Sequence, residues 1–382
     1  MRLFSPLLLS PLLADMIMAV EIVFPPVAAV HGATAQTPLG LKDNVDIVSG
    51  SQFSGLMTFA KLPYVNCFVD TEAERQRYDI AFMGAPFDTG VTARPGARFG
   101  PGGIRQGSRR MNPNFAWSIY TGENVFASWA KVVDCGDAPL TFLDNTVALK
   151  QLDKAHKVVS SRLANSSKVS PTPRIITLGG DHTTTLSALR STYEHCGPVS
   201  IIHFDSHLDT WDPTVLGGGL SSYAGVNHGT FLHIAHEEGL IHNSSLHVGI
   251  RGPVARPKKD IKNDIRCGFE IITSRDMDRI RTHGIVEKIK KRVGSNRVYI
   301  SVDIDVLDPA FAPGTGTAEP GGFTTRELLT ILDALADTDI QLVGADVVEV
   351  APIYDTAGES TVLAAAEVAH SLLALMVSGP VK

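Results

Sequence analysis

Short, nearly continuous apolar runs recur along the chain from about residue 76, and longer segments with a helical pattern separate them. Such runs are typical of parallel strands that helices cover on both faces, because a half-exposed strand alternates polar and apolar residues. The expected strands are 78–84, 131–135, 174–178, 199–204, 246–250, 297–302 and 341–347. The expected crossover helices are about 147–163, 183–195, 229–239, 276–292, 324–336 and 360–377. The pattern predicts an α/β fold with three layers, α/β/α, around a mostly parallel sheet.

Composition and charge exclude several classes of protein. The 382 residues are 44% hydrophobic and 19% charged without a low-complexity run, which excludes a disordered chain, a collagen and a coiled coil. The formal net charge is −6, and lysine and arginine are dispersed, so nucleic acid is not an expected partner. The four cysteines are too few and too dispersed for a disulfide scaffold, so we expect them to be core residues.

The first 35 residues have the pattern of a secretory signal. Arg2 precedes the apolar stretch 3–13, and Ala33-Thr34-Ala35 offers a cleavage site of small residues. This pattern predicts a secreted protein or one of the secretory pathway. The single arginine, together with Asp15 and Glu21, keeps a cytoplasmic or mitochondrial location as the alternative. No uncharged, proline-free stretch of about 18 residues occurs there, so we expect no membrane anchor.

The chain divides into three expected parts: a signal peptide at 1–35, an N-terminal extension at 36–75 and a catalytic domain at 76–382. Two Asn-x-Ser sequons, at Asn165 and Asn243, are compatible with export. No Gly-x-Gly-x-x-Gly or Walker loop follows a strand, so the sequence does not favour a nucleotide site.

Acids and histidines stand where three of the expected strands end, which is where ligands bind in parallel sheets. Asp205, His207 and Asp209 alternate after the strand 199–204, and a period of two places them on one face. Two carboxylates, Asp303 and Asp305, repeat this alternation after another strand. The third strand end supplies His182. We expect the neighbouring Asp181 to be a structural acid and His203 to be a core histidine.

These six side chains predict a metal site. Four carboxylates at one mouth would repel each other and lose hydration, at a cost of several kcal/mol per ion. No lysine or arginine lies in these segments to neutralise them. With neutral imidazoles the set carries a charge of about −4, which two divalent ions would cancel. Carboxylate-rich ligation without thiolates favours manganese, and zinc, cobalt and nickel remain alternatives.

The motifs that carry these residues resemble the arginase and agmatinase family of ureohydrolases, most closely its fungal agmatinase-like members. The resemblance covers roughly residues 78–377. It rests on Arg94-Pro95-Gly96-Ala97-Arg98-Phe99-Gly100-Pro101, Gly179-Gly180-Asp181-His182, Asp205-Ser206-His207-Leu208-Asp209, His228-Gly229-Thr230, the segment 301–316 and Asp346-Val347-Val348-Glu349-Val350. It implies a sheet of about eight parallel strands and a homo-oligomer, either a trimer or a hexamer.

The resemblance also implies a role for each site residue. Asp205 and Asp303 would bridge two manganese ions, and the remaining ligands would be His182 and Asp209 on one ion, His207 and Asp305 on the other. Glu349 matches the glutamate that binds the guanidinium group. His228 matches the histidine that transfers a proton. Such a centre lowers the pKa of water toward neutrality and so supplies a nucleophile.

The implied reaction is hydrolysis of a small guanidino compound to urea and an amine, with agmatine giving putrescine as the leading expectation. The alternative substrate is 4-guanidinobutyrate. We expect the loop 210–227 to overhang the substrate's tail, where Asp212 would meet an ammonium group and Arg94 or Arg98 a carboxylate. Two other classes remain open, a single-zinc deacetylase and a noncatalytic secreted metal-binding protein.

Overall fold

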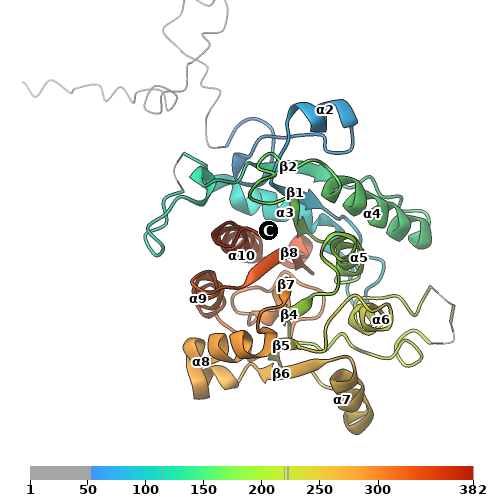
Figure 1. The fold of residues 1–382 in the computed structure, drawn as a ribbon. Coiled ribbons are helices and arrows are strands. Elements are labelled where there is room, and N and C mark those ends of the chain that lie inside the picture. The colour runs from blue at the N-terminus through green and yellow to red at the C-terminus, as the bar shows by residue number, and fades with distance from the viewer. Residues whose placement is uncertain (1–52, 115, 219, 222, 382) are drawn as a thin grey trace, which may run out of the picture. The chain divides into compact units, whose positions relative to one another are not determined.

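The strands of the structure coincide with the apolar runs of the sequence (Figure 1). This computed structural model describes residues 53–381, except 115, 219 and 222. Within that part of the chain, eight strands form one sheet in the order β2-β1-β3-β8-β7-β4-β5-β6. Every neighbouring pair is parallel. The strands are β1 (Ile80–Gly84), β2 (Val132–Asp137), β3 (Arg174–Leu178), β4 (Ser200–Phe204), β5 (Ser245–Ile250), β6 (Phe269–Thr273), β7 (Arg297–Asp303) and β8 (Gln341–Val348).

Helices cover both faces of the sheet, which Figure 1 shows nearly edge-on. Helices α8, α9 and α10 pack together on one face, and α4, α5 and α6 pack together on the other. The helices are α2 (Asp70–Arg75), α3 (Gly100–Gly107), α4 (Asn145–Ser160), α5 (Thr184–Cys196), α6 (Phe231–Glu237), α7 (Pro257–Arg266), α8 (Asp276–Val293), α9 (Thr325–Ala336) and α10 (Ser360–Ser378). The predicted α/β fold with three layers is therefore confirmed.

The sequence analysis missed strand β6 and helix α7, which lie at one edge of the sheet. An edge strand is covered less than a central one, and β6 includes the exposed Glu270 and has no continuous apolar run. Helix α7 consists largely of charged residues and buries only Asp260 and Asp264, so it lacks an apolar stripe. The short helices α2 and α3 were missed as well.

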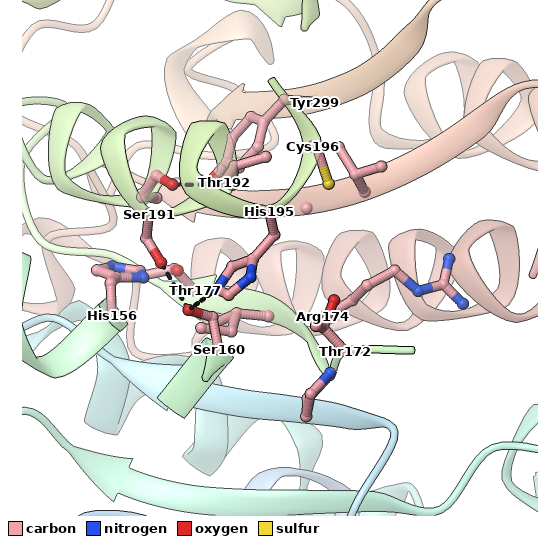
Figure 2. Close-up of a pocket in the computed structure, with 15 residues that line it drawn as sticks. His156, Ser160, Thr172, Arg174, Thr177, Ser191, Thr192, His195, Cys196 and Tyr299 are labelled. Carbon is pink, nitrogen blue, oxygen red and sulfur yellow. Dashed lines mark hydrogen bonds between the residues drawn. The ribbon is translucent and has the colours of Figure 1, made fainter. Parts of the chain in front are cut away.

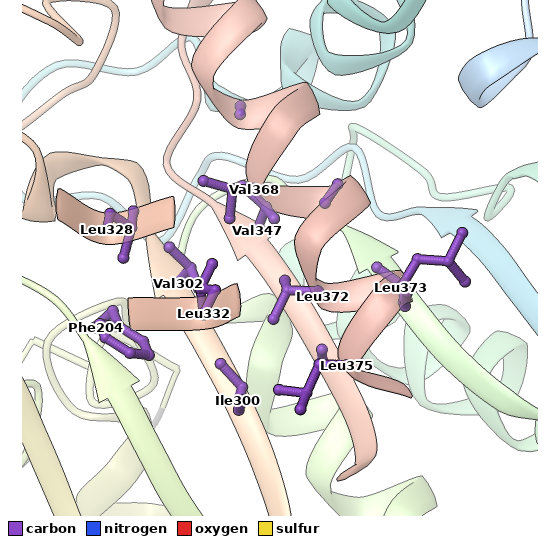
Figure 3. Packing of buried hydrophobic residues seen from close by; sticks show 14 of the residues in the cluster. Phe204, Ile300, Val302, Leu328, Leu332, Val347, Val368, Leu372, Leu373 and Leu375 are labelled. Atoms are coloured by element: carbon purple, nitrogen blue, oxygen red, sulfur yellow. The ribbon is translucent and has the colours of Figure 1, made fainter. Parts of the chain in front are cut away.

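The largest hydrophobic core lies between the sheet and the helices α8, α9 and α10. Figure 3 shows Leu372 and Leu375 of α10 beside Val347 of β8, and Val302 of β7 beyond them. All four side chains are fully buried. This packing fixes the central strands β8 and β7, whose carboxyl ends carry acidic residues.

Helix α10 is long and apolar enough to cross a membrane by length and composition alone, the one such helix among the described residues. However, 67% of its most apolar window is buried inside the protein, against α3, α9 and β8. Its composition is therefore that of a core helix.

Part of the expected N-terminal extension packs against the edge of the sheet. The ring of Phe59 stacks on that of Phe82 in β1, with centroids 4.2 Å apart. A disulfide joins Cys67 to Cys135 in β2, across 68 residues of sequence. Both cysteines are buried, as expected for core residues, but the sequence analysis did not predict that they pair. The pairing could not be read from the sequence, because it depends on where the extension meets β2.

The expected signal peptide, and the extension up to residue 52, lie outside the described residues. From Leu56 onward the chain forms one compact unit, so the segment 56–75 belongs to the same unit as the expected catalytic domain. The other two cysteines, Cys196 and Cys267, are free thiols.

We expect Leu372→Ala to lower the free energy of unfolding by about 2–5 kcal/mol, because it leaves a cavity in the central core. The matched control is Leu363→Ala on the same helix, where the side chain is 41% exposed and the cost should be well under about 1 kcal/mol. Urea denaturation measures both values. Equal losses in the two variants would contradict the assigned core.

Candidate active site

All six predicted metal ligands lie at the carboxyl end of the sheet. They follow or end β3, β4 and β7, which the strand order places within four neighbouring positions. Parallel strands point their carboxyl ends to the same edge, so segments far apart in sequence meet there. The six residues are His182, Asp205, His207, Asp209, Asp303 and Asp305. All are buried except His207, which is partly exposed.

Asp205 is the centre of this cluster. Its Oδ2 lies 3.2 Å from Nδ1 of His182, and its Oδ1 lies 3.3 Å from Nδ1 of His207. Nδ1 of His182 also lies 3.1 Å from Asp209 and 3.4 Å from Asp303. The two oxygens of one carboxylate therefore face two separate groups of side chains.

The second group is completed by Asp305, whose Oδ2 lies 3.1 Å from Nδ1 of His207. The other oxygen of Asp305 accepts hydrogen bonds from the backbone N–H and the hydroxyl of Ser206, at 3.2 and 2.8 Å. Asp205, His207 and Asp305 bring their ligand atoms within 4.8 Å of one another, as do His182, His203, Asp205 and Asp209. Asp205 belongs to both groups.

Hydrogen bonds fix the orientation of the His182 ring. The hydroxyl of Ser301 donates to Asp346 at 2.6 Å, so its oxygen accepts the Nε2–H of His182 at 2.8 Å. Nδ1 of the neutral ring then points a lone pair at three carboxylates. Within the described residues this buried nitrogen has no hydrogen-bond partner, and neither has Oδ2 of Asp205. A lone pair aimed at anions is unfavourable unless a cation lies between them.

The excess of negative charge in the cluster raises the pKa values of several of its residues. Burial opposes protonation of His182, but the carboxylates of Asp205, Asp209 and Asp303 outweigh it and hold its pKa well above the usual range. Burial, with the charges of Asp305 and Asp205, raises the pKa of Asp303 well above that of an ordinary carboxyl. Burial and Asp205 raise the pKa of Asp209 to about 6. Without a metal, protons would take the place of the missing positive charge.

Two residues of the site have a left-handed backbone that L-residues rarely adopt. Asp209 has φ 55° and Glu349 has φ 59°. Such a conformation costs about 1–3 kcal/mol per residue and persists only where the surrounding structure imposes it. The N–H of Glu349 donates to the carbonyl of Gly180 at 2.8 Å, which ties the strained turn after β8 to the turn after β3.

Glu349 and His228 face each other beside the metal-ligand cluster. Oε1 of Glu349 accepts the backbone N–H of His182 at 2.9 Å and lies 2.9 Å from Nδ1 of His228. Nε2 of His228 accepts the backbone N–H of Thr92 at 3.1 Å, so Nδ1 carries the proton that the ring donates to Glu349. Burial lowers the pKa of His228, but Glu349 outweighs this and raises it to about 9.

Gly316 lies close to both Arg94 and Glu349. A Cβ at this position would lie 3.9 Å from Oε2 of Glu349 and only 2.7 Å from the carbonyl of Arg94. The glycine therefore permits a close approach of its backbone to that of Arg94. Nε of Arg94 donates to the Gly316 carbonyl at 3.0 Å, and its guanidinium lies over the Tyr354 ring.

Two of the expected tail-binding residues are engaged elsewhere. Oδ1 of Asp212 accepts the N–H and the hydroxyl of Thr214 in a local turn. Arg98 forms an ion pair with Asp88. Asp181 accepts the N–H of Gly90 and of Thr183, in keeping with the structural role expected for it.

Sequence reasoning missed two buried residues near the site, His247 and Asp264. His203, expected to be a core histidine, is fully buried but also lies 3.0 Å from Asp205 through its Nε2. Its Nδ1 contacts His247, which contacts Asp264 in turn. No local signal marks His247 or Asp264, because the contacts depend on the pairing of β4 with β5 and on the placement of α7.

A separate small cavity of about 30 Å³ lies between α4, α5 and β3, and holds none of the predicted site residues (Figure 2). His156, Ser160, Ser191 and His195 line it, and the Ser160 hydroxyl contacts the last two. A space of this size holds a water molecule or two. Burial lowers the pKa of His156 to about 3, so this histidine stays neutral.

The profile of the Arginase family matches residues 78–375. The chain belongs to this family. It is 52% identical over 340 residues to putative agmatinase 1 of Schizosaccharomyces pombe, which covers 87% of this chain and 84% of that protein. Proclavaminate amidino hydrolase from Streptomyces clavuligerus has a solved structure with a TM-score of 0.73 and 33% identity, covering 86% of this chain and 99% of that one. The agmatinase of Neisseria meningitidis serogroup C is 38% identical over 301 residues, 78% of this chain and 87% of that protein.

These similarities confirm the family and the assignment as an enzyme, a hydrolase of the arginase family. The side chains around Asp205 are a candidate metal centre for such an enzyme, because they include two groups, both with Asp205, in each of which the ligand atoms lie within 4.8 Å of one another. The orphaned Nδ1 of His182 and the excess of carboxylates fit a pair of divalent cations.

We expect Asp303→Asn to be more stable than wild type when EDTA removes all metal. The native state of wild type binds a proton at Asp303 that the unfolded chain, with a carboxyl pKa near 4, does not. The free energy of unfolding of the wild-type protein therefore falls as the pH rises above about 4. The asparagine variant has no carboxyl group at position 303, so its free energy of unfolding does not fall for this reason.

Thermal unfolding at pH 4.5 and pH 7.5 checks the prediction. The variant should unfold about 2 °C or more above wild type at pH 7.5, and the difference should shrink at pH 4.5. The exposed Asp278→Asn is the control and should show no such difference. A variant less stable than wild type at pH 7.5 would show that the cluster is not repulsive.

Proposed function

We propose that this protein hydrolyses a guanidino compound to urea and an amine at a pair of manganese ions, and that agmatine is its substrate. The observation that carries the proposal is the single carboxylate of Asp205, whose two oxygens face two groups of ligand atoms. The names of its relatives, which include agmatinases from yeast and bacteria, support the choice of agmatine.

The contacts of His182 and His207 with the carboxylates indicate which of the six ligands would bind each ion. His182, Asp209 and Asp303 would hold one ion, and His207 and Asp305 would hold the other, with Asp205 common to both. Asp303, whose pKa the charges of both Asp305 and Asp205 raise, would be the second bridging ligand. When bound, the ions lower the pKa of water and neutralise negative charge that develops during hydrolysis.

Glu349 would bind the substrate's guanidinium group. Its Oε1 is held by the His182 backbone and by His228, and its Oε2 faces Gly316. A carboxylate fixed in this way can pair with two guanidinium N–H groups, which orients the central carbon. The strained backbone at Glu349 is consistent with this role, because strain is retained where function requires a fixed direction.

His228 would give a proton to the departing amine. Histidine suits this task because its ring can gain and release a proton, and the raised pKa of about 9 favours the protonated form of His228 near neutral pH. The contact with Glu349 keeps a proton on Nδ1, and Nε2 is linked to Thr92 by its N–H and, at 2.8 Å, its hydroxyl. Thr92 is an exposed residue, so its hydroxyl would give the ring a route by which to regain a proton.

Asp212 and Arg94 are two of the charged residues expected to meet the substrate's tail. Asp212 is engaged in its own turn, so it is not free to pair with an ammonium group without releasing Thr214. Arg94 is exposed, its Nε donates to the Gly316 carbonyl at 3.0 Å, and its guanidinium lies over the Tyr354 ring. This observation favours 4-guanidinobutyrate as the second candidate, since its carboxylate could meet Arg94.

Urea release from agmatine, 4-guanidinobutyrate and arginine by the manganese-loaded protein tests the proposal. We expect turnover of agmatine, a loss of about 100-fold or more in kcat/KM for Glu349→Gln, and a slower kcat with unchanged metal content for His228→Ala. Asp303→Ala should lose activity and metal together. If none of the three substrates releases urea, the result would favour a noncatalytic metal-binding protein. A content of one metal ion per chain would favour a single-zinc deacetylase.

We also propose that the protein follows the secretory pathway and forms a homo-oligomer. The disulfide between Cys67 and Cys135 supports an oxidising compartment, because cytosolic thiols are kept reduced. Expression of the full chain in a eukaryotic host should give protein in the medium with only two free thiols. Protein retained in the cytosol with four free thiols would contradict the proposed route.

A further inference from the structure

A chain of buried polar side chains leads from Asp205 across β4 and β5 to helix α7. Nε2 of His203 lies 3.0 Å from Oδ2 of Asp205, although neither atom has a hydrogen-bond partner among the described residues, and Nδ1 of His203 lies 2.8 Å from Nδ1 of His247. Nε2 of His247 then lies 2.9 Å from Oδ1 of Asp264. All four side chains are fully buried, so solvent does not compete for these contacts.

The strand pairing explains how the two histidines meet. His203 and His247 are directly opposite each other in the parallel register of β4 and β5. His203 and Asp205 are two residues apart along the chain and point to the same face. The ring of His247 stacks on Phe269 with centroids 4.1 Å apart, which fixes its plane. His203 is thus held on one side by β5 and presents its other nitrogen to Asp205.

The far end of the chain returns to the candidate metal centre. The hydroxyl of Thr210 donates to Oδ1 of Asp264 at 2.6 Å, and Nδ2 of Asn263 donates to the carbonyl of Thr210 at 2.6 Å. Thr210 directly follows Asp209, the residue with a strained backbone. Helix α7 therefore contacts both ends of the segment 205–209, through His247 and His203 at one end and through Thr210 at the other.

Packing alone does not account for this arrangement. Burying a carboxylate and two imidazoles costs free energy that apolar side chains of similar volume would not cost. His247 and Asp264 do not belong to either group of ligand atoms found among the described residues. Their contacts lead to the candidate ligands without supplying one.

We propose that His247 and Asp264 are positioning residues that hold His203 against the shared carboxylate of Asp205. The proposal rests on the metal centre proposed above and adds the residues that keep its central ligand in place. Mutation of residues that contact metal ligands without binding the metal themselves typically weakens metal affinity by about 10–100-fold. Because Asp205 is shared, the loss should affect both ions together.

Metal affinity tests the proposal independently of turnover. Competition with a fluorescent chelator measures Mn²⁺ binding to the full-length protein, and the visible spectrum of the Co²⁺-loaded protein reports the ligand geometry. His247→Phe keeps the ring that stacks on Phe269 and removes both polar contacts. Asp264→Asn keeps the volume and removes the charge. His247→Asn keeps an amide beside His203 and should recover part of the affinity.

His156→Phe is the matched control. His156 in α4 is as deeply buried as His247 and lines the small cavity, whose lining includes none of the candidate site residues (Figure 2). We expect His247→Phe and Asp264→Asn to bind Mn²⁺ about 10-fold more weakly or worse, with an altered Co²⁺ spectrum. His156→Phe should bind as wild type does.

The outcomes separate the two proposals. Wild-type affinity for both ions in folded His247→Phe and Asp264→Asn would overturn the positioning role while leaving the metal centre standing. An equal loss in His156→Phe would also overturn it, because the effect would then reflect core disruption. Wild-type protein that binds no pair of ions would overturn the metal centre and the positioning role with it.

Discussion

The convergence of buried carboxylates on Asp205 is the constraint on which the rest of the site depends. Asp205, Asp209, Asp303 and Asp305 lie in a mouth with almost no access to water, and the nearby histidines turn ring nitrogens toward them. Coulomb repulsion at these distances is several kcal/mol even with an effective dielectric constant of about 20. The arrangement is therefore stable only when positive charge, as metal ions or as protons, occupies the space between the oxygens.

The fold supplies this convergence without a dedicated metal-binding loop. Parallel strands direct their carboxyl ends to one edge, and the order β3-β8-β7-β4 brings residues from four segments together. The packing of α10 on β8 and β7 fixes the two central strands from one side. Glu349 follows β8 between the strands that carry the ligands, so the group that would orient the substrate lies beside the groups that would hold the metal.

The sequence was sufficient for the parts of the structure that are encoded locally. Continuous apolar runs marked seven of the eight strands, and alternating acids and histidines marked the ligand candidates at their ends. It was insufficient where a contact depends on register. His247 looks like any strand residue until its pairing with His203 is known, and Asp264 lies in a charged helix without an apolar stripe. The Cys67–Cys135 bond likewise joins residues that only the folded edge of the sheet brings together.

A crystal of the protein grown with manganese tests the central claim most directly, through the anomalous scattering of the metal. The account predicts two anomalous peaks per chain, one on each side of the Asp205 carboxylate, with His182 at one peak and His207 at the other. A single peak, or peaks at which Asp205 contributes to only one, would contradict it.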